Sequence, residues 1–180
     1  MSYSKEYQQQ IIQLHKDREK HGRRKFHDEE IDFIMNEFNP KSIFDFGCGK
    51  GTFLKQMKEL YPKIKMIGFD PGIVEYTNVK KVPCELLISC DVLEHVEPDH
   101  VDDTLKEIDT LFTKFAFFKI ANYEAKAVLP DGRNAHLIQE DENWWKKKVE
   151  KNMPKSNIVK CYLHQHRKKR KKDVIVILKK

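Results

Sequence analysis

The sequence predicts an α/β fold in which a mainly parallel sheet carries helices on both faces. Three observations predict it: strand-like apolar runs alternate with amphipathic helices, a glycine-rich turn joins the first strand to a helix, and an acidic residue ends the second strand. The 180 residues (21.4 kDa) are enough for one domain with its own core. We find no linker and no internal repeat, so we expect residues 1–180 to form a single domain.

Two helices are expected before the first strand. The first has helical spacing of apolar residues and ends near Gly22, so we expect residues 1–27 to form a helical cover. The second begins at about Asp28, which can cap it, and ends at Asn39-Pro40. The buried faces are expected to hold Tyr7, Ile11, Leu14 and Arg18 in the first helix and Ile31, Ile34, Met35 and Phe38 in the second.

The remaining elements alternate between strand and helix. Strands are expected at residues 42–46, 64–69, 86–90 and 115–121, and a closing hairpin within 157–180 pairs 157–163 with 173–178 across a basic turn. Helices are expected from Thr52 to Pro62, from Pro98 onwards, and around Trp144 and Trp145. Their apolar stripes are Phe53, Leu54, Met57, Leu60 and Tyr61 in the first, and Val101, Leu105, Ile108 and Phe112 in the second.

The turn after the first strand predicts a ligand site. Gly47, Gly49 and Gly51 let the backbone turn sharply and approach a ligand closely, and the free N–H groups of the helix from Thr52 point into the same turn. Asp70 ends the next strand, 19 residues beyond Gly51. Parallel strands place their carboxyl ends together, so Asp70 is expected in the same crevice, where a carboxylate can accept both hydroxyls of a ribose.

The residues around this turn argue against two nucleotide-binding motifs. The GxxxxGK[ST] pattern of a P-loop is absent, and the GxGxxG pattern of a dinucleotide site fails where Thr52 stands in place of the third glycine. Asp45, directly before the loop, would repel a pyrophosphate. These residues fit instead a nucleoside ligand that carries positive charge, either an amino acid ammonium or a sulfonium.

Three motifs resemble a known family. Asp45-Phe46-Gly47-Cys48-Gly49-Lys50-Gly51 is similar to motif I of the class I S-adenosylmethionine-dependent methyltransferases, and Asp70 matches the acid that holds the ribose diol in that family. Cys90-Asp91-Val92-Leu93-Glu94-His95-Val96 resembles the fourth-strand motif of its small-molecule branch. The resemblance covers roughly residues 28–122 and implies a Rossmann-like fold, S-adenosyl-L-methionine as cofactor, and transfer of a methyl group to O or N of a small-molecule or sugar-like acceptor.

The resemblance also implies which residues bind the cofactor. Gly47 and Gly49 would line its methionine part, Asp45 would hold its ammonium, and Asp70 would bind its ribose. The full implied set is Asp45, Phe46, Gly47, Cys48, Gly49, Gly51, Asp70, Pro71, Asp91 and Val92. One departure from the family concerns residues 71–85, where the usual member fits a helix and a third strand. These 15 residues are too few, so the third strand is expected to be missing or short.

Acceptor-side residues are expected above the carboxyl edge of the sheet. The candidates for a base are Glu94, His95 and His136. The candidates for binding the acceptor are Asp131, Arg133, Asn134 and Trp144, with the planar guanidinium of Arg133 binding an anionic group.

No metal site is predicted, because the four cysteines (Cys48, Cys84, Cys90 and Cys161) form no CxxC pair. The same pattern suits a reducing, cytoplasmic setting.

Charge is uneven along the chain. Residues 146–180 hold fourteen basic and two acidic residues, a net charge of +12, whereas residues 1–145 carry −6. One alternative function is therefore methylation of RNA or a nucleotide through this basic segment. A second alternative, a non-catalytic cofactor-binding module, is suggested by the shortened interval after Asp70 and the small size of the chain. The densest run, residues 164–172, is equally explained as a solvated hairpin turn. No apolar run approaches the ~18 residues that span a bilayer, and the N-terminus lacks the apolar stretch of a secretory signal. The sequence leaves the oligomeric state open.

Overall fold

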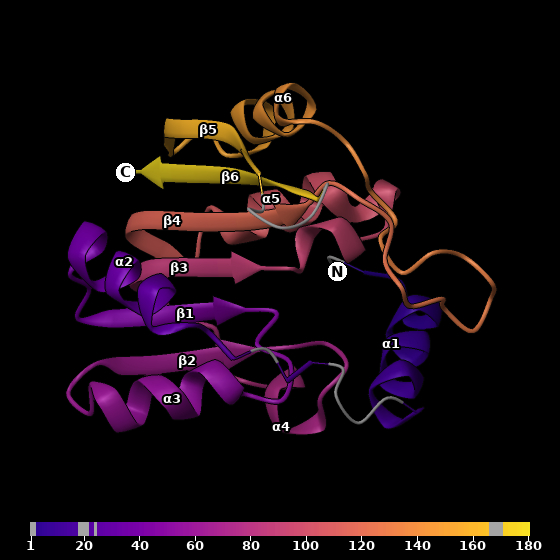
Figure 1. Ribbon diagram of the computed structural model, residues 1–180, viewed down its shortest axis with the longest axis horizontal. Helices are drawn as coiled ribbons and strands as arrows, with labels where there is room; N and C mark the ends of the chain where they lie inside the picture. The colour runs from indigo at the N-terminus through magenta and orange to yellow at the C-terminus, as the bar shows by residue number, and fades with distance from the viewer. Residues whose placement is uncertain (1–2, 18–21, 24, 166–170) are drawn as a thin grey trace.

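The computed structural model describes residues 3–17, 22–23, 25–165 and 171–180. Within these residues six strands form one sheet in the order β2-β1-β3-β4-β6-β5 (Figure 1). The strands are β1 (Ser42–Phe46), β2 (Lys65–Phe69), β3 (Cys84–Cys90), β4 (Phe112–Ala121), β5 (Asn157–Gln165) and β6 (Lys172–Lys179). The helices are α1 (Lys5–Asp17), α2 (Asp28–Phe38), α3 (Thr52–Leu60), α4 (Val74–Thr77), α5 (Val101–Ile108) and α6 (Glu142–Asn152), with 3₁₀ helices η1 (Leu93–His95) and η2 (Pro98–His100).

The sheet is mostly parallel, which confirms the predicted fold class. Strands β1 to β4 pair in parallel, and β6 runs antiparallel to both β4 and β5 as the predicted closing hairpin. The carboxyl ends of β1, β2 and β3 therefore meet at one edge of the sheet. Helix α1 lies across that edge, at the right in Figure 1.

The third strand expected in the family is missing. Residues 70–83, all of which the structure describes, contain the four-residue helix α4 and no strand. Strand β2 consequently forms the edge of the sheet beside β1. The segment is too short to cross over and return a further parallel strand, since such a crossover needs a dozen or more residues before the strand itself.

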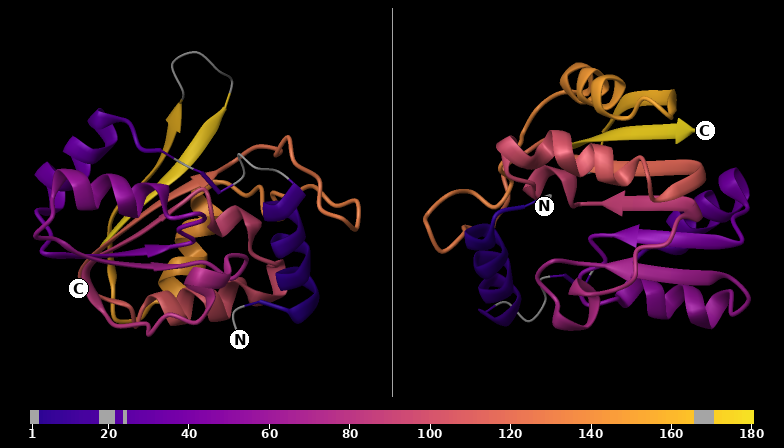
Figure 2. Two further views of the ribbon diagram at one scale, coloured as in Figure 1. Left: turned by 90° about the horizontal axis from the view of Figure 1, so that it is seen from below. Right: turned by 180° about the vertical axis from the view of Figure 1, so that it is seen from behind.

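Each face of the sheet is buried under helices, as Figure 2 shows. Neighbouring residues of a strand point to opposite faces, so Ile43 packs with the side chains of α2 and α3, whereas Phe44 packs with those of α5 and α6. The same alternation separates Leu86 from Leu87 on β3. Strands buried on both faces explain why the sequence shows continuous apolar runs there.

Three predicted details of the helices are wrong. Helix α2 is capped by His27, whose extended backbone lets its N–H donate to Glu30 Oε2 (3.0 Å), so Asp28 is already helical. Leu60 lies in the last turn of α3 and is 54% exposed. Phe112 does not continue the helix, because α5 ends at Ile108 and Phe112 opens β4 in register with Cys84. The predicted helical position Arg18 lies outside the described residues.

Met57 and Leu60 provide a direct test of how α3 packs. Met57→Ala is expected to lower the free energy of unfolding by about 2–5 kcal/mol, because this side chain is fully buried and its removal leaves a cavity. Leu60→Ala on the same helix is expected to change it by less than about 0.5 kcal/mol. Urea denaturation of both variants measures the difference, and equal losses would contradict the packing described for α3.

Candidate functional site

A cavity of about 390 Å³ opens at the carboxyl edge of the sheet. Its floor comes from the ends of β1, β2 and β3 and its cover from α1. Its walls combine carboxylates, glycines and aromatic rings: Asp45, Phe46, Gly47, Cys48, Gly49, Phe53, Phe69, Asp70, Pro71, Asp91, Val92 and His95, with Tyr7, Ile11, His15 and Arg23 from the N-terminal segment. A cleft of this size, mainly apolar with a few converging polar groups, is typical of a small-molecule site.

The glycine loop bends tightly over the end of β2. The backbone N–H groups of Gly47 and Cys48 both donate to the carbonyl of Phe69, at 2.7 and 3.0 Å. Gly47 has φ +83°, and a Cβ there would lie 2.3 Å from a methyl group of Val92. Glycine is thus required by the backbone conformation and by the close approach of Val92.

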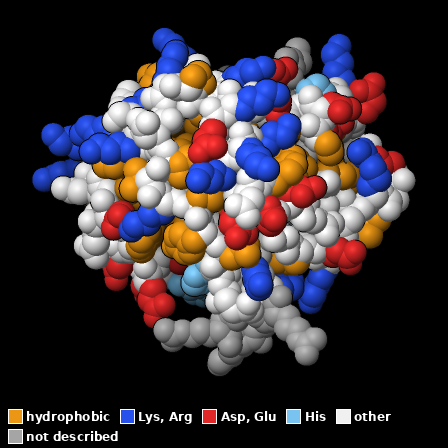
Figure 3. Space-filling view, turned by 90° about the horizontal axis from the view of Figure 1, so that it is seen from above, with side chains coloured by type: hydrophobic (Ala, Val, Ile, Leu, Met, Phe, Trp, Pro, Cys, Tyr) orange, Lys and Arg blue, Asp and Glu red, His pale blue; other side chains and the backbone are white. Residues whose placement is uncertain are grey.

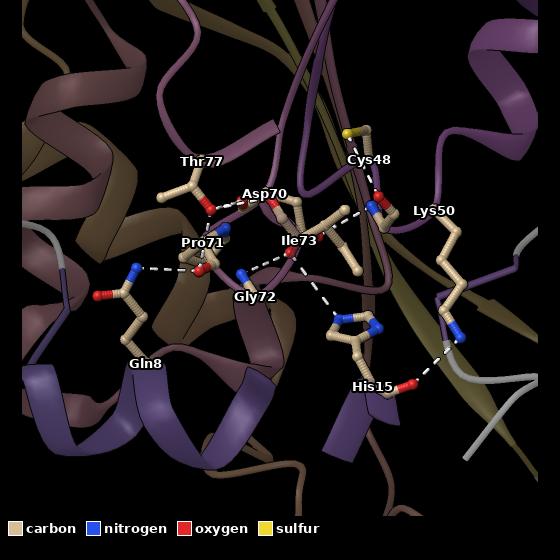
Figure 4. Close-up of polar contacts among 10 residues, drawn as sticks. Gln8, His15, Cys48, Lys50, Asp70, Pro71, Gly72, Ile73 and Thr77 are labelled. Carbon is tan, nitrogen blue, oxygen red and sulfur yellow. Dashed lines mark hydrogen bonds and ion pairs between the residues drawn. The ribbon is translucent and has the colours of Figure 1, made fainter. Parts of the chain in front are cut away.

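Asp70 ties three segments together in the site (Figure 4). Its Oδ2 accepts the N–H of Gly49 and its Oδ1 accepts the N–H of Gly72, each at 2.8 Å. The ring Nε2 of His15, from α1, lies 3.8 Å from Oδ1. Asp70 is only 6% exposed. A buried carboxylate needs such partners, and these contacts fix where it faces the cavity.

Helix α1 is fastened over the cavity at several points. Ser4 donates both its backbone N–H and its hydroxyl to the carboxylate of Glu97, and Gln8 Nε2 donates to the carbonyl of Pro71. At the other end, the N–H of Lys50 donates to the carbonyl of Gly22 (2.8 Å) and Lys50 Nζ to the carbonyl of His15 (3.2 Å). The N-terminal segment therefore closes directly onto the glycine loop.

The electrostatic character of the cavity is anionic around the loop. Three aspartates line it, Asp45, Asp70 and Asp91, and Arg23 of the N-terminal segment lines it as well. Burial raises the pKa of the Cys48 thiol well above its usual range, and the charges of Asp45 and Asp70 raise it further. Cys48 is thus a neutral wall residue rather than a nucleophile.

A second polar cluster lies beside the cavity. Glu94 and His95 belong to η1, and His136 comes from the loop that follows β4. The His95 and His136 rings stand nearly perpendicular with centroids 4.8 Å apart, and His136 Nε2 is 4.0 Å from Glu94 Oε1. Desolvation lowers the pKa of His136, which favours the neutral imidazole. His95 lines the cavity, whereas Glu94 and His136 stand behind it.

The predicted acceptor-binding residues lie away from the cavity. Arg133 pairs with Asp131 (Nη2 to Oδ2, 2.7 Å), and this pairing holds the pKa of the Asp131 carboxyl below its usual range. The side chain of Asn134 exchanges two hydrogen bonds with the backbone of Ala125. Trp144 lies in the first turn of α6, which Asp141 caps, and packs against Trp145. Each residue thus has a local structural partner, and a role in acceptor binding stays a prediction.

The cofactor-binding positions predicted from the resemblance are brought together, with Gly51 outside the cavity wall at the N-cap of α3. Sequence reasoning missed the residues that the N-terminal segment contributes, namely Tyr7, Ile11, His15 and Arg23. The apolar stripe of α1 could have indicated them, because such a stripe must pack against another part of the protein. In the structure it packs against the cavity and against Leu129 and Ala135.

Several described lysines of the C-terminal segment form ion pairs with acidic residues. Lys148 and Lys151 both contact Asp102, and Lys160 contacts Glu37. On the face above α6 and β5, Figure 3 shows Lys and Arg side chains mixed with acidic and apolar ones. Residues 166–170 of the predicted basic turn lie outside the described residues. No helix within the described part of the chain combines the length and apolar character needed to cross a membrane.

Comparison with known proteins identifies the domain. A family model described as a methyltransferase domain matches residues 19–146. Magnesium protoporphyrin IX methyltransferase from Synechocystis, solved with bound S-adenosylmethionine, superposes with a TM-score of 0.61 at 11% identity over 97% of each chain. An N-methyltransferase from Bradyrhizobium japonicum, solved with S-adenosylhomocysteine, gives 0.53 at 10% identity over 84% of this chain and 83% of that one.

A candidate O-methyltransferase from Nostoc punctiforme also superposes, with a TM-score of 0.54 at 12% identity over 84% of this chain. Our chain spans 55% of the length of that protein. At such low identity these structures establish the shared fold. No curated protein matches the sequence.

Gly49 and Gly132 make a matched pair for testing the closed cover. Both have positive φ (+53° and +90°), but a Cβ on Gly49 would lie 2.3 Å from the carbonyl oxygen of Gly22, whereas one on Gly132 meets nothing within 4 Å. Gly132→Ala is expected to lower the free energy of unfolding by about 1–2 kcal/mol, which is the penalty for the left-handed backbone alone. Gly49→Ala is expected to lower the free energy of unfolding by more than this and to speed amide hydrogen exchange in α1. Equal losses of stability in the two variants, with unchanged exchange in α1, would show that α1 does not contact this loop.

Proposed function

Because the chain belongs to the methyltransferase-domain family, we propose that it is an S-adenosylmethionine-dependent methyltransferase acting on O or N of a small-molecule or sugar-like acceptor. The observation that carries the proposal is the cavity at the carboxyl ends of β1, β2 and β3. There a loop of bare glycine backbone lies between the carboxylates of Asp45 and Asp70. Such a site suits a nucleoside that is cationic at one end.

The cofactor fits the cavity in one orientation. Its ribose lies against Asp70, a carboxylate of the cavity wall whose oxygens accept the N–H groups of Gly49 and Gly72. A carboxylate can accept both hydroxyls of a ribose. Its methionine part follows the backbone of Gly47 and Gly49 past Val92, with Asp45 near the ammonium. Arg23 then faces the carboxylate, for which a guanidinium is well shaped. The solved relatives that bind S-adenosylmethionine or S-adenosylhomocysteine support this choice of cofactor.

The protein's share of the reaction is alignment and exclusion of water. The cofactor supplies a methyl group already activated on a sulfonium, so the chain must hold an acceptor atom in line with it. Tyr7 and Ile11 of α1 close the outer side of the cavity, and Val92 and Val96 form its apolar inner side near His95. The mostly apolar wall strengthens the attraction between the carboxylates and the cation, because it lowers the local dielectric constant.

The acceptor is a small molecule rather than RNA. Four of the six described lysines of residues 146–160 form ion pairs, Lys146 with Glu150, Lys148 and Lys151 with Asp102, and Lys160 with Glu37. None of these six lysines lines the cavity. The four cysteines are free thiols, three of them buried, which suits a reducing, cytoplasmic setting. Retention of RNA in an electrophoretic assay, with strong salt dependence, would favour the nucleic acid acceptor instead.

Asp70→Asn tests the cofactor site. The exchange keeps the size of the side chain but removes the charge-assisted hydrogen bonds to ribose, so calorimetry should show S-adenosylhomocysteine affinity reduced by about 10- to 100-fold. Asp103→Asn, which alters an exposed carboxylate paired with Lys106, is the control and should bind as the unaltered chain does. Thermal unfolding checks that both variants fold. The cofactor assignment fails if the unaltered chain binds neither S-adenosylmethionine nor S-adenosylhomocysteine.

Arg23 tests the orientation of the cofactor. Arg23→Gln is expected to weaken S-adenosylhomocysteine binding by roughly tenfold, because it removes a charged partner of the amino acid carboxylate. It should leave the affinity for 5′-methylthioadenosine unchanged, since that compound lacks the amino acid. Lys25→Gln, an exposed cation two residues away, is the matched control. Equal weakening of both ligands in Arg23→Gln would place Arg23 near the adenosine half instead.

A further inference from the structure

Glu94, His95 and His136 bring three metal-ligating side chains to one point. One ligand atom of each lies within 4.8 Å of the others, although the residues come from η1 and from a loop about 40 residues later in the chain. The backbone links these two segments, because the N–H of Ile138 donates to the carbonyl of Glu94 (3.0 Å). A backbone hydrogen bond therefore fixes the positions of η1 and of this loop relative to each other, and with them the positions of the three side chains.

Both imidazoles are held in the form that ligates metals. His95 Nδ1 lies 2.6 Å from the carbonyl oxygen of Ala135, and His136 Nδ1 lies in hydrogen-bond contact with the carbonyl of Tyr123. A carbonyl only accepts, so Nδ1 carries the proton in each ring, and Nε2 is the ring atom that can bind a metal. Metal-binding histidines commonly have this Nδ1–H to carbonyl bond, which fixes the tautomer and orients the ring.

Glu94 completes the set with an anionic ligand. Its side chain is fully buried, with Oε1 4.0 Å from His136 Nε2. A divalent cation is a favourable partner for a carboxylate held out of water in this way. Ligands at 2.0–2.2 Å around a tetrahedral ion lie roughly 3.3–3.6 Å from one another. The three ligand atoms, now up to 4.8 Å apart, therefore need to approach one another by up to roughly 1.5 Å.

We propose that Glu94, His95 and His136 bind one divalent transition-metal ion at the inner end of the cofactor cavity. Two imidazoles and one carboxylate suit Zn²⁺, Fe²⁺ or Co²⁺ better than Mg²⁺ or Ca²⁺, which prefer all-oxygen sites. Three protein ligands leave coordination positions open, as in metal sites that act on a substrate. Because His95 lines the cavity, an ion bound to its ring would lie beside the space proposed for the cofactor and acceptor.

The metal gives the proposed methyl transfer a preference for oxygen acceptors, an inference that rests on the proposed function. A hydroxyl bound to the ion loses its proton to solvent more easily. Its oxygen lone pair then forms the new O–C bond, and the C–S electron pair moves to sulfur, leaving a neutral thioether. In this account Glu94, His95 and His136 are ligands, and none of them takes the proton of the acceptor.

Titration with Co²⁺ tests the site independently of activity. The full chain is stripped with a chelator, dialysed into metal-free buffer and titrated with Co²⁺ while visible absorption is recorded. We expect one equivalent to bind with the absorption of a low-coordinate nitrogen and oxygen site, and Zn²⁺ to displace it. His95→Ala and His136→Ala should each weaken binding by about 100-fold or more, since even second-shell changes cost 10- to 100-fold.

Two controls make the result decisive. His100→Ala removes a histidine that contacts Glu97 outside the cluster and should bind Co²⁺ as the unaltered chain does. Glu94→Gln preserves the shape of the buried side chain and should weaken binding with the fold retained by thermal unfolding. Absence of saturable binding, or unchanged binding in the double variant of His95 and His136, would overturn the proposal.

Calorimetry with S-adenosylhomocysteine on the same samples separates this inference from the proposed function. Cofactor binding without Co²⁺ binding would overturn the metal site alone and return His95 and His136 to the role of candidate bases. Co²⁺ binding without cofactor binding would overturn the methyltransferase assignment and leave the metal site standing.

Discussion

The buried carboxylate of Asp70 is the interaction on which the site depends. By accepting the N–H groups of Gly49 and Gly72, it joins the end of β2 to the glycine loop after β1, and through His15 it faces the N-terminal helix. The sheet alone would bring β1 and β2 together, but it would not set the curvature of the loop between β1 and α3. The Phe69 carbonyl bends the loop by accepting the N–H groups of Gly47 and Cys48, and Asp70, which lines the cavity, holds the bent loop against two further segments.

The carboxyl edge of the sheet is organised as one connected unit. The loop after β4 supports α1 through Leu129 and Ala135, and the same loop places His136 behind His95. The loop after β4 therefore supports both the helix that covers the cavity and the cluster of Glu94, His95 and His136. Loss of the third strand does not weaken this arrangement, because residues 70–83 retain the turn that carries Asp70 and Gly72 and replace the strand with the short helix α4. The chain thereby keeps the elements of the methyltransferase fold that surround the cavity.

Local sequence pattern was enough to predict the sheet. The strand at 42–46 matches β1 in both bounds, and the short interval after Asp70 correctly indicated a missing strand, since chain length limits what can be built there. Local sequence pattern could not predict which distant segments contact one another. The approach of Gly22 to Gly49, the place of Arg23 in the cavity wall and the meeting of Glu94 with His136 all depend on how α1 and the loop after β4 fold back over the sheet. Leu60 lies on the predicted apolar stripe of α3 but is exposed, because the stripe does not show how far along the helix the packing against the sheet extends.

Hydrogen–deuterium exchange with and without S-adenosylhomocysteine tests the central claim most directly. The account predicts that the ligand slows exchange in three loop regions of the sheet edge, residues 45–51, 69–73 and 90–93, and in α1, while α6 is unaffected. Protection confined to the C-terminal hairpin and α6, or absent from the glycine loop and Asp70 at saturating ligand, would contradict it.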